Sequence, residues 1–259
     1  MIIMASAISP RAEVSPKAKI GNNCKIYPFA YIEDDVVIGD DCIIFPFVSI
    51  LNGTRMGNKN KIHQGSVIGA LPQDFNFTGE KSEVILGECN VIRENVVINR
   101  ATHTGGQTVI GNNNFLMEGA HISHDSKLGD HCVLSYGAKV GGDCTIGTGV
   151  ILGSAVIMHG GTGVGNGVVA KAGTNFAKDV PPYIIVGGSP ASFQGVNAAM
   201  CERYGVSDKV IKHIANAYRL VFHGKTDPME ACRQIVEQVP DSPEIQNIVS
   251  FIRSSKGII

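Results

Sequence analysis

The sequence predicts a mainly β protein, in which a parallel β-helix of hexapeptide repeats is followed by a C-terminal α-helical domain. Three observations predict this fold. An aliphatic residue recurs at every sixth position over most of residues 8–176, a glycine often follows it, and beyond residue 178 the pattern changes to helical spacing. A period of six fits neither an amphipathic helix nor a heptad, whereas short strands separated by regular turns match it.

The repeat keeps its register through two interruptions. It runs from Ile8 to Ile68, resumes at Leu86, and resumes again at Ile110 to end at Phe176. Three repeats of six make one triangular coil, so residues 18 apart are expected to stack on one face with the aliphatic position inside. The small residue four positions later is expected to fill a corner of the prism. Most of the cysteines occupy this corner position: Cys24, Cys42, Cys132 and Cys144.

The interruptions and the end of the repeat define the organisation of the chain. The first insertion spans about residues 70–85 and the second about 102–108. Insertions in solenoids often carry function or join subunits, and tolerated surface loops are the alternative interpretation. We assign the β-helix to residues 1–183, because consecutive prolines in Lys178–Tyr183 cannot continue a sheet. Residues 184–259 are assigned to a connector and a helical domain.

Three helices are expected in this C-terminal domain. Ser207 is suited to cap the first, which ends near Gly224. Asp227-Pro228 opens the second, and Ser242-Pro243-Glu244 opens the third. Together they are expected to close the end of the prism, with a role in substrate binding as the alternative.

Composition narrows the class of function. The 22 Lys and Arg residues balance 23 Asp and Glu without a basic block, which argues against an extended nucleic-acid surface. None of the seven cysteines falls in a CxxC pair, so neither a disulfide framework nor a zinc ribbon is indicated, and a reducing cytoplasm fits. No apolar run reaches the roughly 18 residues of a membrane span. We expect a cytoplasmic protein without a metal or other cofactor.

The segment Gly119–Asp125 holds the most concentrated acid–base chemistry of the chain. His124 and Asp125 occupy the third and fourth positions of a repeat, which lie outside the prism, and His121 ends the preceding repeat. An imidazole oriented by a carboxylate is suited to deprotonate an alcohol near neutral pH. Gly142, one coil further on, is expected to offer an unobstructed backbone N–H to an oxyanion. Spacing alone leaves open which histidine acts.

No serine or cysteine lies in a recognisable nucleophile elbow. Direct transfer to a substrate alcohol is therefore favoured over a covalent acyl-enzyme.

These features together resemble the bacterial acyl-carrier-protein:UDP-N-acetylglucosamine O-acyltransferases, which begin lipid A synthesis. The resemblance covers nearly the whole chain and rests on the hexad run and on five ordered segments. They are Gln73-Asp74, Gly119-Ala-His-Ile-Ser-His-Asp125, Lys178–Tyr183, Gly195-Val-Asn197 and the helical tail. It implies a cytoplasmic homotrimer of left-handed β-helices with active sites between subunits. It also implies transfer of an (R)-3-hydroxyacyl group from acyl carrier protein to the sugar 3-hydroxyl of UDP-N-acetylglucosamine.

The resemblance also implies roles for single residues. His124 would be the general base, Asp125 its orienting partner, and the Gly142 N–H the oxyanion donor. The residues implied in contacts to the sugar or the nucleotide are Gln73, Asp74, His121, Asp143, His159, Asn197 and Arg203. Ala172 falls in the region that measures acyl chain length.

Several positions depart from well-known family members, and Gly160-Gly161 follow His159 where larger residues are common. Asp143 stands where a histidine is usual, Asn76 where a lysine is, and Tyr204 where a second arginine is often found. These departures leave the base in place and leave open an amino-sugar analogue as acceptor of an O- or N-acyl group.

Three alternative functions fit parts of the sequence less well. The related N-acyltransferase carries an additional N-terminal domain, for which hexads starting at Ile8 leave no room. A trimeric β-helix carbonic anhydrase needs three zinc histidines, and the spacing of His121, His124 and His159 fits that site poorly. A non-catalytic scaffold would not require His124.

Overall fold

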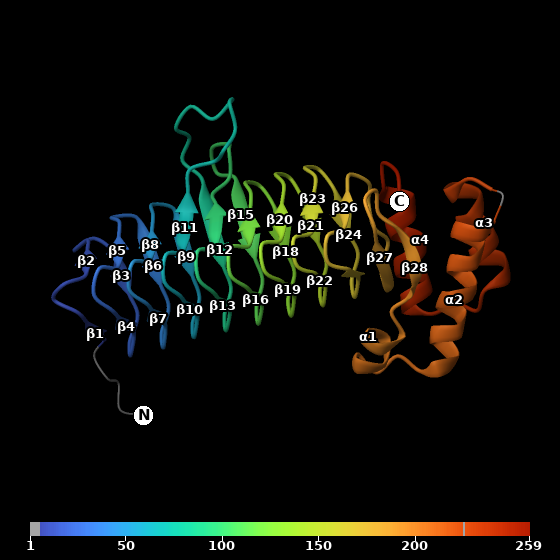
Figure 1. Cartoon of the computed structure of the whole chain (residues 1–259), viewed down its shortest axis with the longest axis horizontal. Helices are drawn as coiled ribbons and strands as arrows, with labels where there is room; N and C mark the ends of the chain where they lie inside the picture. Colours follow the sequence, from blue (N-terminus) through green and yellow to red (C-terminus); the bar gives the residue numbers. More distant parts are fainter. Residues whose placement is uncertain (1–5, 225) are drawn as a thin grey trace.

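The computed structural model describes residues 6–224 and 226–259, which form a long prism with a group of helices at its C-terminal end (Figure 1). Strands in successive coils pair in parallel with a constant register. Ala7 lies opposite Lys25, for example, and Ile8 lies opposite Ile26. The predicted stacking of residues 18 apart is therefore confirmed for the uninterrupted coils.

The strands of the described residues form three sheets of 11, 9 and 8 strands. Sheet A contains β1 (Ala7–Ile8), β4 (Lys25–Ile26), β7 (Ile43–Ile44), β10 (Lys61–Ile62), β13 (Val91–Ile92), β16 (Phe115–Leu116), β19 (Val133–Leu134), β22 (Ile151–Leu152), β25 (Val169–Ala170), β27 (Ile184–Gly187) and β28 (Ser192–Val196). Sheet B contains β2 (Glu13–Val14), β5 (Tyr31–Ile32), β8 (Ser49–Ile50), β11 (Val67–Ala70), β14 (Val97–Asn99), β17 (His121–Ile122), β20 (Lys139–Val140), β23 (Ile157–Met158) and β26 (Asn175–Phe176). Sheet C contains β3 (Lys19–Ile20), β6 (Val36–Ile38), β9 (Thr54–Met56), β12 (Glu83–Leu86), β15 (Gln107–Ile110), β18 (Lys127–Leu128), β21 (Thr145–Ile146) and β24 (Gly163–Val164).

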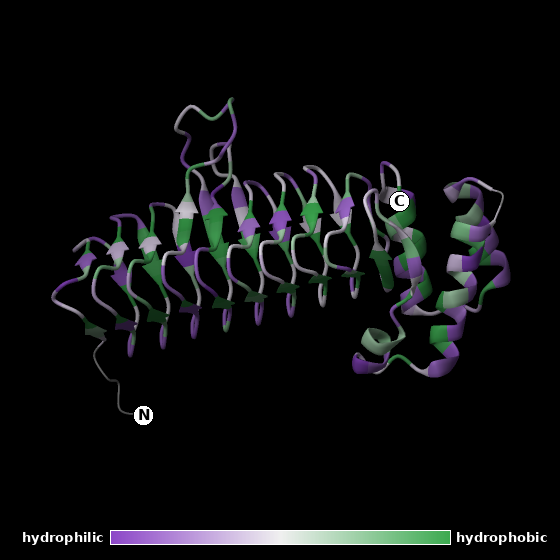
Figure 2. Ribbon diagram, in the orientation of Figure 1, coloured by the Kyte–Doolittle hydropathy of each residue, from purple (hydrophilic) through white to green (hydrophobic). Residues whose placement is uncertain are grey.

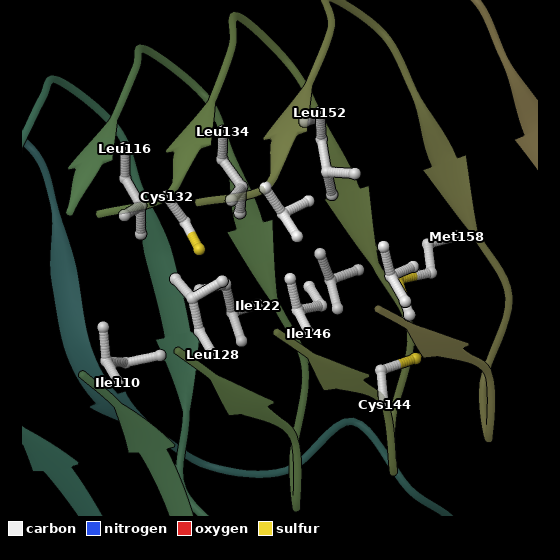
Figure 3. Packing of buried hydrophobic residues seen from close by; sticks show 14 of the residues in the cluster. Ile110, Leu116, Ile122, Leu128, Cys132, Leu134, Cys144, Ile146, Leu152 and Met158 are labelled. Atoms are coloured by element: carbon white, nitrogen blue, oxygen red, sulfur yellow. The ribbon is translucent and has the colours of Figure 1, made fainter. Parts of the chain in front are cut away.

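The aliphatic position of each repeat points into the prism. Leu116, Ile122 and Leu128, one from each sheet, meet in the interior of one coil (Figure 3), and none is more than 3% exposed. Hydrophobic residues recur in every coil along the prism, with hydrophilic segments between them (Figure 2). Truncating one of these side chains to alanine is expected to cost about 2–5 kcal/mol, because neighbouring coils cannot collapse into the cavity.

A short ladder of buried asparagines interrupts the small corner residues. Asn60, Asn90 and Asn114 are all fully or almost fully buried. The side-chain oxygen of Asn60 accepts a hydrogen bond from the Asn90 backbone, and that of Asn90 accepts one from the Asn114 backbone, both at 2.9 Å. Each of these amides thus accepts a hydrogen bond from the next coil. Such hydrogen bonds offset the cost of burying a polar group.

One sheet continues beyond the prolines, contrary to the expectation from sequence. β27 pairs in parallel with β25, and β28 then turns back antiparallel to β27. The prolines end the repeat without ending the sheet, because Pro181 and Pro182 precede the strand and β27 supplies its own backbone donors.

The described tail contains four helices: α1 (Ala198–Arg203), α2 (Asp208–His223), α3 (Pro228–Gln238) and α4 (Pro243–Ser254). The three predicted helices are confirmed, and the side chains of Ser207, Asp227 and Ser242 accept the expected capping hydrogen bonds. The short helix α1 was not predicted. Its cap is Asn197, whose side chain accepts a hydrogen bond from Met200 N.

The helices pack against the end of the prism, as predicted. Tyr218 of α2 is fully buried and donates its hydroxyl to the carbonyl of Pro182. Phe193 of β28 stacks on Phe222 of α2 with ring centroids 4.4 Å apart. These contacts cover the last coil with apolar side chains, as solenoid ends require.

Candidate active site

The candidate site lies at the corner that follows β17 in sheet B. Ile122 points inward, and His124 and Asp125 follow on the outside of the turn. Asp125 has a positive φ of 59° and donates its backbone N–H to the Thr108 hydroxyl, 2.9 Å away. The turn therefore directs two consecutive polar side chains away from the core.

Asp125 is held by several donors at once. Its Oδ2 lies 2.9 Å from His124 Nδ1 and accepts hydrogen bonds from the Thr102 backbone and hydroxyl at 3.1 and 2.8 Å. Burial alone would raise the pKa of this carboxyl, but the hydrogen bonds from His124 and Thr102 outweigh it and lower the pKa. Asp125 is therefore ionised near neutral pH and orients the imidazole.

The first insertion brings a second carboxylate to the other side of the same ring. Asp74 Oδ2 lies 3.8 Å from His124 Nε2, while Asp74 Oδ1 accepts a hydrogen bond from Asn76 N at 2.7 Å. The Asn76 bond fixes the carboxylate of Asp74. His124 is thereby placed between two acidic side chains from separate segments.

Gly142 lies directly against the His124 ring, one coil further on. A side-chain carbon at Gly142 would lie 2.4 Å from His124 Cε1 and 2.6 Å from Nε2. Within the described residues the Gly142 N–H has no hydrogen-bond acceptor, whereas its carbonyl accepts from Gly161 N at 2.8 Å. A glycine is required here by the close approach of the imidazole, and its N–H is available to a substrate oxygen.

His121 and Asp143 flank this group. His121 starts β17 and lies beside Lys139 of β20. Burial, with Lys139 and His124 nearby, lowers the pKa of His121 below its usual range. Asp143 donates its backbone N–H to the His124 carbonyl at 3.0 Å, and its side chain is exposed.

The remaining predicted residues divide into two groups. Gln73 is exposed beside Asp74 on the first insertion. His159 follows β23 on the same side of the prism as the site, with Nε2 2.9 Å from Asn175 Oδ1.

The second group lies elsewhere on the chain. Arg203 of α1 lines a cavity of about 360 Å³ together with Phe115 and Ile151 of sheet A. The buried side chain of Asn197 caps α1 and donates to the Gly167 carbonyl at 2.8 Å. Ala172 is exposed on the turn between sheets A and B. A single chain therefore does not assemble all the predicted residues.

The structure differs from the sequence interpretation in the environment of His124. The spacing placed His124 outside the prism, yet this residue is only 9% exposed. Asp74 of the first insertion lies beside His124, and Thr102 of the second bonds Asp125. The two insertions are joined to each other, since Gly105 N donates to Lys81 O and Glu83 N donates to Gly106 O, both at 2.9 Å. Thr102, which bonds Asp125, was not predicted as a site residue, because it lies in an insertion, outside the register that located His124, Asp125 and Gly142.

The described residues show neither a metal-binding cluster nor a membrane-spanning helix. No three His, Cys, Asp or Glu side chains are grouped as a metal-binding set within residues 6–224 and 226–259. None of the helices in that part of the chain has the length and apolar character of a membrane-spanning segment.

The fold and the site define a transferase of the hexapeptide-repeat class. The family model for bacterial transferase hexapeptide repeats matches residues 17–50, 35–70 and 107–142. The model for domain 2 of UDP-N-acetylglucosamine O-acyltransferase matches residues 179–259. The match to the second model extends the assignment from the prism to the helical tail.

Relatives cover the chain almost completely. Acyl-[acyl-carrier-protein]–UDP-N-acetylglucosamine O-acyltransferases of Saccharophagus degradans and Halorhodospira halophila are 39% and 37% identical over 97% of this chain and 98% of theirs. The crystal structure of a UDP-N-acetylglucosamine acyltransferase from Bacteroides fragilis superposes with a TM-score of 0.95 at 45% identity, covering 97% of this chain and 99% of that one. The Francisella novicida enzyme superposes at 0.92 with 30% identity, covering 97% and 93%.

The chain therefore belongs to the UDP-N-acetylglucosamine O-acyltransferase family, and its prism is the left-handed parallel β-helix that the resemblance implied.

Proposed function

We propose that this protein transfers an (R)-3-hydroxyacyl group from acyl carrier protein to the 3-hydroxyl of UDP-N-acetylglucosamine, the first step of lipid A biosynthesis, in the cytoplasm. The observation that carries the proposal is the placement of His124 against Asp125, Asp74 and Gly142. Relatives named acyl-[acyl-carrier-protein]–UDP-N-acetylglucosamine O-acyltransferase match 97% of this chain, which supports the proposal.

His124 is the general base of the proposed mechanism. Nδ1 is engaged by Asp125, so Nε2 takes the proton of the sugar hydroxyl as its oxygen attacks the thioester carbonyl carbon. The oxyanion that forms accepts the free N–H of Gly142. The carbon–sulfur bond then breaks, and the proton passes from His124 to the departing thiolate, which leaves an ester and the carrier thiol.

The residues near His124 favour direct transfer over an acyl-enzyme. Ser126 is buried in the prism, and its hydroxyl donates to the Gly141 carbonyl at 2.9 Å. Cys144 is also buried, and burial raises the pKa of its thiol. A buried thiol and a buried hydroxyl are poor nucleophiles, so His124 acts on the substrate alcohol itself.

The divided site supports a homotrimer with active sites between subunits. Arg203 lines its cavity with sheet A residues, whereas His124 follows sheet B. The outward side chains of sheet A are mostly apolar, and they include Ile43, Val91, Phe115, Val133, Ile151, Val169 and Ile185. An apolar sheet face of this length is suited to a second copy of the chain, which brings the nucleotide contacts to the base.

The proposal is tested by mass spectrometry of products. Purified protein is incubated with UDP-N-acetylglucosamine and a mixture of hydroxyacyl carrier proteins of different chain lengths. The expected product is one 3-O-hydroxyacyl sugar nucleotide, formed by wild type and abolished by His124→Ala. An amide product formed only with an amino-sugar nucleotide would identify the alternative acceptor instead.

A matched control separates catalysis from folding. His63→Gln changes a histidine at another corner of the prism, where the ring stacks on Phe45. This variant is expected to keep activity and oligomeric state. Full activity of His124→Ala, in protein that elutes at the wild-type size, would rule out the proposed base.

A further inference from the structure

A second histidine contacts the carboxylate that orients His124. His103, in the second insertion, has its Nδ1 3.2 Å from Oδ1 of Asp125, whereas His124 Nδ1 lies 2.9 Å from Oδ2. The side chain of Asp125 is 7% exposed and that of His103 is 70% exposed. One buried carboxylate therefore lies between a covered imidazole and a solvent-facing one.

The loop holds His103 in this position. The preceding residue, Thr102, bonds the same carboxylate through both its backbone and its hydroxyl. The ring of His103 rests on Gly106, where a side-chain carbon would lie 2.7–2.9 Å from three ring atoms. Gly106 N also donates to the His103 carbonyl at 2.8 Å, and Gly106 itself is buried. The contact is thus set by packing within the loop, although the side chain is exposed.

The charged groups near His103 determine how this side chain acts on the site. Among the described residues, Asp125 is the ionisable group in contact with it; His124 lies on the other oxygen of that carboxylate, and Asp74 lies beyond His124. A neutral His103 donates from Nδ1 and holds the carboxylate in place. A protonated His103 adds a positive charge that opposes the one His124 gains when it takes a proton.

We propose that His103 is a positioning residue for acyl transfer. It holds Asp125, and through it the ring of His124, and its charge at low pH opposes protonation of His124. This role rests on the proposed function, because it acts on the proposed base. Asp125 contacts two imidazoles, so a positive charge on either ring acts on this carboxylate.

The test compares His103→Ala, His103→Gln and Thr104→Ala in acyl transfer by the full-length protein. His103→Ala is expected to lower kcat about three- to tenfold with an unchanged KM, since one solvent-screened hydrogen bond to a charged group is lost. His103→Gln keeps a donor and should stay within about twofold of wild-type kcat. The exposed neighbour Thr104→Ala should match wild type.

The pH profile separates positioning from a merely structural role. Both His103 variants lose the second charge, so the acidic limb of kcat/KM should move to higher pH in each, and in Thr104→Ala it should stay in place. Unchanged kcat and an unchanged acidic limb in His103→Ala would overturn the proposal. So would equal losses of kcat in the two variants with the acidic limb in its wild-type place.

An activity-independent measurement distinguishes this proposal from the proposed function. Histidine ring NMR of the intact protein should show that Asp125→Asn changes the nitrogen chemical shift of His103 Nδ1, because the carboxylate in contact with it is lost. An unchanged Nδ1 shift contradicts the contact even where acyl transfer is normal. Absence of acyl transfer in the wild type, with a changed Nδ1 shift in Asp125→Asn, would instead count against the proposed function.

Discussion

Asp35 and Asp125 occupy the same place in the repeat, yet only Asp125 belongs to the candidate site. Each is the third residue after an inward-pointing isoleucine of sheet B, Ile32 in one coil and Ile122 in the other. Asp35 pairs with Arg55 at 2.7 Å and is 65% exposed. Asp125 pairs with His124 at 2.9 Å and is 7% exposed.

The difference comes from what covers each corner. The two insertions lie over the Asp125 corner, where Thr102 supplies two hydrogen bonds and Asp74 closes the far side of His124. Solvent reaches the Asp35 pair, so its attraction is screened and contributes little to stability. The same position of the repeat therefore holds a surface ion pair in one coil and an oriented acid–base group in another, and the backbone differs as well, because Asp125 has a positive φ of 59°.

The largest effect is expected from removing the proposed base. His124→Ala should lower kcat by roughly 10²- to 10⁴-fold, because general-base catalysis contributes that much. Steady-state rates of acyl transfer measure it, with size-exclusion chromatography to confirm an intact assembly. A loss below tenfold would place the base elsewhere.

Gly142→Ala tests the close approach of the ring. The new carbon would lie 2.4 Å from His124 Cε1, so the imidazole must move, and a displacement of that size is expected to lower kcat about 10²-fold. The backbone N–H is retained, so the loss reports the ring position. In a His124→Ala background the same substitution should cost little, because the ring is absent. Additive losses in the double variant would contradict this explanation.

Asp125→Asn and Asp35→Asn compare the covered and the exposed aspartate directly. Asp125→Asn should lower kcat about 10- to 100-fold, since the imidazole loses the carboxylate that fixes its orientation. Asp35→Asn should leave kcat and Tm close to wild type, because its pair is exposed. Equal effects of the two substitutions would mean that burial under the insertions is unimportant.

The pH dependence of stability reports on His121, which lies on the strand leading into the covered corner. Burial, with Lys139 and His124 nearby, lowers its pKa from the usual 6.5, so the unfolded chain binds the proton more readily. Its contribution to stability is present above pH 6.5 and is lost as pH falls from 6.5 through the lowered pKa. His121→Gln should therefore lose less Tm than wild type between pH 7 and pH 5.

Burial is the main cause that lowers the pKa of His63, so this residue also makes stability fall as pH falls. The pH dependence of Tm in His121→Gln should therefore be smaller than in wild type without vanishing. Tm at a fixed protein concentration checks this, because the proposed homotrimer would make Tm depend on concentration. Parallel Tm profiles for wild type and His121→Gln would contradict the expected role of burial.

The repeat made most of the fold predictable. A constant period fixes which way each residue points, because its face depends only on its place in the hexad. The period therefore predicted that Ile122 lies inside, that His124 and Asp125 lie outside, and that Gly142 is next to them. The three capped helices were predictable for a similar reason, since capping chemistry is local. Helix α1 was not predictable, because the helix that Asn197 caps has only 6 residues and shows no apolar period.

The sequence by itself therefore determined the prism, the register of its coils and the corner at which the acid–base pair stands. Tertiary structure alone decided how that corner is enclosed. The insertions break the period, so their residues carry no register, and only the fold shows that Asp74, Thr102 and His103 converge on His124 and Asp125. Such contacts join segments far apart in sequence, and no local pattern encodes them.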